Sequence, residues 1–235
     1  MWLFSSGLRT FKILARTILQ FIKDVVMGLD NIINKVKKEI DVLRGEEVKD
    51  TEFSNENTYP DERSATEAFV RSKQKLFGVD NWSGLPGINS TFKLFDGAGN
   101  KVTDRDPQIG DFVQIILPGP GPENWVTVTN IRNEENLAEF TVSPSPAPAP
   151  HTNNTEEVKH FFGKEASSTF RVERQENKLK AYEIGRNERP NNQGAEAGNR
   201  AVVNTLIAEG GWAGFQALQW DKLTRYLVHL KEAKV

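Results

Sequence analysis

The segment Thr91-Phe92-Lys93-Leu94-Phe95-Asp96-Gly97-Ala98-Gly99-Asn100 decides the fold class, because an alternating run leads directly into a turn cluster. Alternation of apolar and polar residues is typical of a half-buried antiparallel strand, and glycines favour turns because they tolerate positive φ. Further runs of this kind follow before Gly185, at residues 112–117, 125–131, 138–142, 158–163, 169–174 and 179–184. We therefore predict six or seven short strands, with one face of the sheet in the core and the other in solvent.

Helical patterns flank this region on both sides. Residues 65–77 predict a helix with Ser64 as its N-cap and Glu67 at the capping-box position. Residues 196–209 and 212–232 predict two more, and Trp82 is expected to cover one end of the core. The expected fold is α+β: a long N-terminal amphipathic helix, then a curved antiparallel sheet or partly open barrel of six to seven strands flanked by helices, with a long C-terminal helix.

Residues 8–43 give the clearest helical pattern, with apolar residues at steps of three and four. This spacing permits a coiled-coil seam, so the helix is expected to pack on its own domain, self-associate or hold a dedicated partner. The four basic residues and one acidic residue of 1–27 also favour peripheral contact with an anionic membrane surface. The residues expected to form the tether are Leu8, Phe11, Ile18, Ile22, Val25, Leu29 and Ile32.

Composition shifts divide the chain into three parts: the helix at 1–45, a polar linker at 46–63 and a globular α+β domain at 64–235. Within the domain, Ser143 to Pro150 reads Ser-Pro-Ser-Pro-Ala-Pro-Ala-Pro, and a polar continuation extends it to residue 155. Alternating prolines favour extended polyproline II. We expect an exposed loop between two strands, with docking to an aromatic groove of a partner as the alternative.

The composition excludes several classes of chemistry. The 235 residues hold 30 basic and 32 acidic side chains, a net charge of −2 that gives no global attraction to nucleic acid. With no cysteine and three histidines, thiolate chemistry is absent and a histidine-rich metal site is not expected. Nucleotide-binding glycine motifs are missing, so no cofactor is expected. Without a signal-peptide or membrane-spanning pattern, we expect a cytoplasmic protein, with membrane contact only at the surface.

Candidate binding residues lie where the last strand ends. Arg186, Asn187 and Glu188 form the densest local group of directional hydrogen-bonding side chains, although an exposed turn would look the same. Trp212 and Trp220 are candidates to line a cavity between the last helix and the sheet, with plain packing as the alternative. No strand-to-helix serine elbow occurs, so no residue is assigned a catalytic role. Candidates to support an enzyme are His160 beside Ser167 or Ser168, and His229 in the last helix.

The order of elements, a sheet flanked by helices and followed by a last helix laid over it, resembles helix-grip lipid carriers of the START-like kind. The resemblance implies a cavity between sheet and last helix. The proline-rich insertion and the N-terminal helix are not part of that pattern, and no motif identifies a specific family.

Three functions fit these observations. The first is a non-enzymatic binding or assembly module, tethered through its N-terminal helix to a protein partner, to itself or to a membrane surface. The second is a carrier of a small apolar ligand in a cavity between the sheet and the C-terminal helix. The third is an effector-type enzyme of unknown substrate that uses acidic residues with Arg186, His160 or His229.

Overall fold

The computed structural model describes residues 49–103, 105–116, 124–149, 151, 163–188 and 211–231, with backbone alone at 211–218. All of them belong to the larger of the two units into which the chain divides, Val42–Val235. The predicted N-terminal helix, the strand at 158–162 and the helix at 196–209 lie outside the described residues. No helix among the described residues combines the length and the apolar character needed to cross a membrane.

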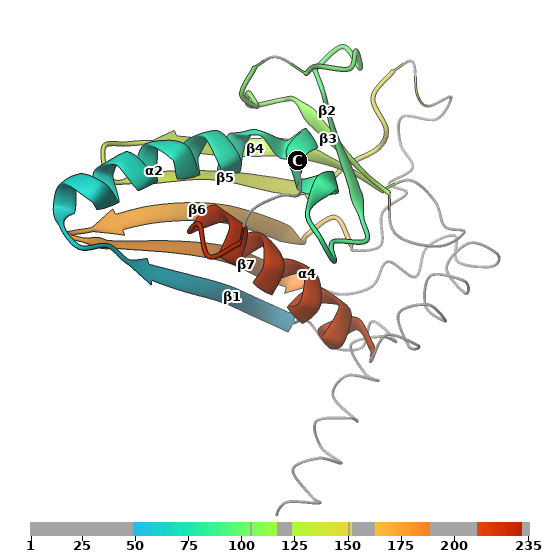
Figure 1. Cartoon of the computed structure of the whole chain (residues 1–235). Coiled ribbons are helices and arrows are strands. Elements are labelled where there is room, and N and C mark those ends of the chain that lie inside the picture. The colour runs from blue at the N-terminus through green and yellow to red at the C-terminus, as the bar shows by residue number, and fades with distance from the viewer. Residues whose placement is uncertain are drawn as a thin grey trace, which may run out of the picture. The chain divides into compact units, whose positions relative to one another are not determined.

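The described elements follow one another as a strand, two helices, six strands and a helix (Figure 1). Their bounds are β1 Lys49–Thr58, α2 Glu62–Phe77, the 3-10 helix η1 Val79–Gly84, β2 Thr91–Phe95, β3 Phe112–Ile116, β4 Asn124–Asn133, β5 Leu137–Pro144, β6 Ser167–Gln175, β7 Lys178–Glu188 and α4 Gly211–Leu227.

The seven strands form one curved, open, antiparallel sheet in the order β1-β7-β6-β5-β4-β3-β2. Strands β2 to β7 follow one another as a meander, and β1 joins the far side of β7. Helices α2 and α4 pack on one face, which we call the inner face (Figure 1). The other face carries cross-strand charged pairs such as Arg171 with Glu139. The predicted antiparallel sheet with one core face is thus confirmed, and it is an open sheet rather than a barrel.

The segment predicted as a polar linker contains β1. Thr51, Phe53, Asn55 and Asn57 face inward on this strand, and only one of the four is strongly apolar. The alternation of hydrophobicity that marks a half-buried strand is therefore missing. The linker assignment is wrong for Lys49–Thr58, because β1 is held by pairing with β7 and by side-chain hydrogen bonds to α4.

Helix α2 begins three residues earlier than predicted. Asp61, not Ser64, is its N-cap, since the Asp61 carboxylate accepts the backbone N–H of Ser64 at 2.7 Å. The Ser64 N–H, which the Glu67 side chain would accept in the predicted capping box, is thus bonded to Asp61. Glu67 instead forms an exposed ion pair with Arg63.

The core between α2, η1 and the sheet is aromatic. Trp82, predicted to cover one end of the core, is buried at its centre, with its ring 5.9 Å from that of Phe140, 5.6 Å from that of Phe92 and 4.9 Å from that of Phe170. Its indole N–H donates to the carbonyl of Lys75 at 2.9 Å, so the buried polar atom is satisfied.

Helix α4 lies over β1 and β7, and its C-terminal half is fixed by hydrogen bonds (Figure 1). The Asn55 amide donates to Asp221 and Thr224, and that of Asn57 donates to the carbonyl of Val228 at 2.9 Å. The helix ends at Leu227, five residues before the predicted end, because a turn follows in which His229 takes a φ of 63°.

The proline-rich stretch is a loop after β5, as predicted, over its described residues 145–149, but it is partly buried rather than exposed. Strand β5 continues through Pro144, and the side chains of Ser145 and Pro148 are buried. Behind them, His151 packs on Phe95 and Trp125 and its ring N–H donates to the carbonyl of Gly99 at 2.8 Å. The alternating prolines cannot donate to a ladder, but the segment still buries side chains beyond the end of β5, where the Ser145 N–H donates to the carbonyl of Trp125.

Candidate functional site

The inner face of β7 changes character along the strand. Its inward residues are first apolar, Leu179 and Ala181, and then polar, beginning with Glu183. Two aromatic residues flank Glu183 on the neighbouring strands: it pairs with Phe53 of β1 on one side and with Phe170 of β6 on the other. A carboxylate therefore sits on the core face of the sheet between two aromatic rings.

Glu183 has no exposed surface, and neither of its carboxylate oxygens has a hydrogen-bond partner among the described residues. Burial, and secondly the negative charge of Glu188, raises the pKa of Glu183 well above its ordinary value of 4.5. The Ser168 hydroxyl lowers that pKa by a smaller amount, but its geometry does not meet that of a hydrogen bond. Such an unsatisfied, desolvated acid is uncommon in a packed core and is typical of functional sites.

A bulge at the end of β7 brings Glu188 back to the same face. Asn187 takes a φ of 53°, and the side chain of Glu188, 1% exposed, then turns inward and accepts the Thr51 hydroxyl at 3.2 Å. Glu188 occupies the space above Gly185, where a Cβ would collide with both Glu188 and Thr51. The glycine thus allows the second carboxylate to enter the interior beside Glu183.

Helix α4 covers this acidic end. Asn55 contacts α4 at Asp221 and Thr224. A strand advances about 3.3 Å per residue and a helix about 1.5 Å, so two residues of β1 match roughly four of α4. Phe53, and with it Glu183, therefore lies level with residues 217–220 of α4, and of these Gln219 and Trp220 have described side chains. The Trp220 ring lies 5.5 Å from that of Phe170, the residue opposite Glu183, which agrees with this placement.

Both α4 residues at this level carry unsatisfied polar atoms. Gln219 is 3% exposed and its side-chain oxygen has no donor, while the buried indole N–H of Trp220 has no acceptor among the described residues. We call the group formed by Glu183, Glu188, Gln219 and Trp220 the inner acidic site. It holds more acceptors than donors, in a region lined by aromatic rings.

The structure separates the residues that the sequence grouped at the end of β7. The Arg186 side chain is exposed and lies 3.8 Å from the carboxylate of Asp50, and Asn187 is exposed, with its backbone N–H donating to Asp50. Of that group, only Glu188 faces the interior. Trp220 lies at the same site, while Trp212 belongs to the first turn of α4, where only the backbone is described.

The histidine near the C-terminus has a structural environment. The Nε2 of His229 lies 3.0 Å from the carbonyl oxygen of Ala68, so it carries the proton, and Nδ1 accepts from the Lys75 ammonium at 2.8 Å. The nearby hydroxyl of Ser72 donates to the carbonyl of Leu227, which leaves it bound rather than poised as a nucleophile. This cluster joins α2 to the end of α4. His160 lies outside the described residues.

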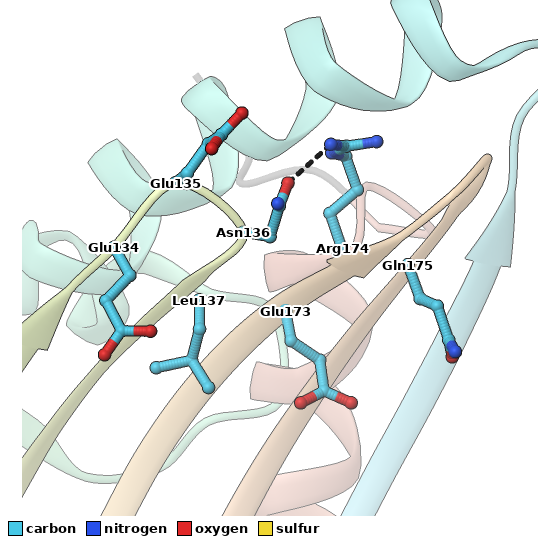
Figure 2. A pocket seen from close by; sticks show the side chains of 7 residues that line it. All are labelled: Glu134, Glu135, Asn136, Leu137, Glu173, Arg174 and Gln175. Carbon is cyan, nitrogen blue, oxygen red and sulfur yellow. Dashed lines mark hydrogen bonds between the residues drawn. The ribbon is translucent and has the colours of Figure 1, made fainter.

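A surface depression of about 490 Å³ opens where two hairpins end (Figure 2). Part of its polar lining is paired: Arg174 donates to the Asn136 side chain at 2.5 Å, and Glu134 pairs at 2.8 Å with Arg132, which lies outside the lining. The lining residues are Glu134, Glu135, Asn136, Leu137, Glu173, Arg174 and Gln175. We interpret it as a solvated hairpin end. Across the described part of the chain, no three histidine or acidic side chains are placed to hold a metal ion.

Sequence reasoning missed Glu183 and Gln219. A signal for Glu183 was present, because it has the same parity as the apolar Leu179 and Ala181 on one strand, and an acid at an inward position is unusual. Gln219 gave no such signal. Its importance depends on which face of α4 meets the sheet at that level.

No family model matches the chain, and no curated protein matches it. Several solved structures are similar at low scores. A hypothetical protein from Helicobacter pylori has 12% identity and a TM-score of 0.44 over 79% of this chain and 92% of its own. The major latex-like protein 151 of Panax ginseng has 12% identity and a TM-score of 0.37, over 78% and 98%.

A norcoclaurine synthase from Thalictrum flavum, in complex with dopamine and hydroxybenzaldehyde, has 12% identity and a TM-score of 0.36 over 80% of this chain and 92% of its own. With TM-scores below 0.5, these similarities establish neither a family nor a function for this chain.

Proposed function

We propose that this chain is a binding protein for a small organic molecule, which it holds between the inner face of the sheet and α4. One observation carries the proposal: Glu183 is fully buried, and both of its oxygens lack a partner among the described residues. A ligand that supplies hydrogen-bond donors there would remove the cost of an unsatisfied buried acid. This is the carrier function derived from the sequence, with a ligand that is not wholly apolar.

The surroundings suit a ligand better than they suit stability alone. The other half of α4 is held by satisfied bonds from Asn55 and Asn57, so the helix does not need the inner acidic site to stay in place. The aromatic rings of Phe170 and Trp220 provide apolar surface beside the polar atoms. Sites for small molecules typically combine an apolar lining with a few convergent polar groups.

The test uses the full chain purified without denaturant. Native mass spectrometry should show one small molecule per chain, or the protein should bind the neutral dye N-phenyl-1-naphthylamine saturably at one site. Hydrogen exchange should then slow at residues 183–188 of β7 and 219–227 of α4, and stay unchanged at the surface depression at 134–137. The proposal is contradicted if the native mass equals that of the polypeptide alone and the dye shows no saturable binding. It is also contradicted if hydrogen exchange slows only at the surface depression.

Tethering through residues 8–43 stays a prediction that depends on their apolar spacing. Light scattering on the full chain and on a version lacking residues 1–45, with and without anionic liposomes, tests it. A difference between the two in assembly size or in liposome association supports a tether. Identical behaviour, or unfolding of the shorter version, contradicts it.

A further inference from the structure

The unsatisfied atoms of the inner acidic site indicate the charge of its ligand. Glu183 offers two carboxylate oxygens and Gln219 one amide oxygen, all buried and all without a donor in the described structure. Against these three acceptors stands a single unmatched donor, the indole N–H of Trp220. A ligand that satisfies this set must bring mainly donors.

The described cations nearest in sequence to these residues are engaged elsewhere. Arg186 follows the site on β7, but its exposed side chain lies near Asp50 and donates to the carbonyl of Gly185. On α4, the ammonium of Lys222 donates to the carbonyl of Gly87 at 2.7 Å, and Arg225 pairs with Asp221. Among the described residues, therefore, no lysine or arginine forms a hydrogen bond with the Glu183 carboxyl group, and the charge of Arg186 lowers its pKa only as the last of four contributions.

Aromatic rings surround the same point. Phe53 and Phe170 flank Glu183 on the two adjacent strands, and the Trp220 ring lies 5.5 Å from Phe170 and 6.4 Å from Phe92. Ring faces attract an organic cation, and they also pack against an apolar or aromatic substituent. A metal ion would need more oxygen ligands and gains nothing from these rings.

We propose that the ligand of the inner acidic site is an organic amine: a protonated primary ammonium group bound to Glu183 and Gln219, joined to an arylalkyl body that packs on Phe170 and Trp220. This inference rests on the proposed small-molecule function and specifies its ligand class. The three N–H donors of an ammonium match the three unmatched acceptors. The Trp220 N–H remains available for an acceptor atom elsewhere on the amine.

The test compares three probes of similar size by titration calorimetry on the full chain at pH 7: 2-phenylethylamine, 2-phenylethanol and 3-phenylpropanoate. The amine should bind on the order of tenfold to a hundredfold more tightly than the alcohol, the range expected for a charge-assisted hydrogen bond. The propanoate should bind least. Burial raises the pKa of Glu183, and a bound ammonium group lowers it again, so amine binding should also release protons, seen as an enthalpy that differs between phosphate and Tris buffers.

Two variants locate the effect. Glu183→Gln should reduce the preference for amine over alcohol to about twofold and abolish proton release, because the amide cannot ionise. Glu52→Gln is the matched control, since Glu52 lies on the adjacent strand but its exposed side chain points to the opposite face. It should leave the preference unchanged. Circular dichroism establishes that both variants are folded.

The outcomes separate the two proposals. Equal binding of amine and alcohol, or binding of the neutral dye but of none of the three probes, overturns the amine and leaves the binding protein standing. An amine preference that survives in Glu183→Gln overturns the assignment to this site. Absence of saturable binding for the dye and all three probes overturns the proposed function itself.

Discussion

Replacing Glu183 by glutamine should stabilise the free protein, increasingly so as the pH rises. A group whose pKa is raised in the folded state contributes stability that is fully present below its unfolded pKa and is lost as the pH rises through the folded pKa. For Glu183 the unfolded value is 4.5, and burial beside Glu188 raises the folded pKa well above it. Glutamine cannot titrate, so the variant loses this dependence on pH.

The size of this stabilisation follows from the linkage between proton binding and folding. Between pH 4.5 and the folded pKa, each pH unit should increase the difference in unfolding free energy between variant and wild type by up to about 1.4 kcal/mol. One such unit corresponds to a rise in melting temperature of roughly 3–6 °C for a chain of this length. Below pH 4.5 both side chains are neutral and of similar shape, so the difference there should be small.

Urea unfolding of both proteins, followed by tryptophan fluorescence from pH 4 to pH 8, measures this difference. Taking the difference at each pH removes the titration of groups that the two proteins share, and Glu52→Gln provides the exposed control. A difference that is flat with pH would show that Glu183 has the same pKa folded and unfolded. A variant less stable than wild type at pH 8 would show that the carboxylate is ionised and paired, which contradicts our account of the site.

Three further substitutions test the surrounding structure. Gly185→Ala places a Cβ against Thr51 and should destabilise by about 1–3 kcal/mol, measured by urea unfolding. Asn57→Ala removes the hydrogen bond to the Val228 carbonyl and should lower the free energy of unfolding by about 1 kcal/mol, with faster hydrogen exchange confined to the end of α4. Unchanged exchange there would show that this bond does not hold the end of α4. Asp61→Ala removes the N-cap of α2 and should lower stability by about 1 kcal/mol, while Asp61→Asn should retain most of it.

The sheet could be predicted from the sequence because its strands differ on their two faces. Residues 91–95, 112–116 and 179–184 alternate or cluster their apolar side chains, and turn residues separate them. These local signals agree with the fold because the three strands bury the face that their own pattern marks as mainly apolar. Helix α2 precedes the meander of β2 to β7, as the capping and turn signals of the sequence indicated.

Strand β1 and the inner acidic site could not be predicted in this way. The inward residues Asn55 and Asn57 are explained by α4, which lies more than 160 positions away in the sequence. Glu188 faces inward because a positive φ at Asn187 interrupts the alternation of β7. In each case the burial of a polar side chain depends on a tertiary contact or on one backbone angle. Neither can be predicted from the pattern of hydrophobic residues along a strand.

The contrast between the two ends of the described side chains of α4, at Gln219 and Trp220 and at Asp221 to Leu227, favours binding over a purely structural role for the buried acids. Where the helix crosses Asn55 and Asn57, its polar contacts are satisfied and fix it to β1. At the level of Glu183, the described residues leave two carboxylate oxygens and the Gln219 oxygen without donors. An apolar side chain at position 183 would pack between Phe53 and Phe170 without the free-energy cost of burying unsatisfied polar atoms. Among its described side chains, the helix is therefore anchored at the C-terminal end and carries its unsatisfied polar atoms at Gln219 and Trp220. A ligand that brings donors would gain most at that place, because it would satisfy atoms whose desolvation has already occurred on folding.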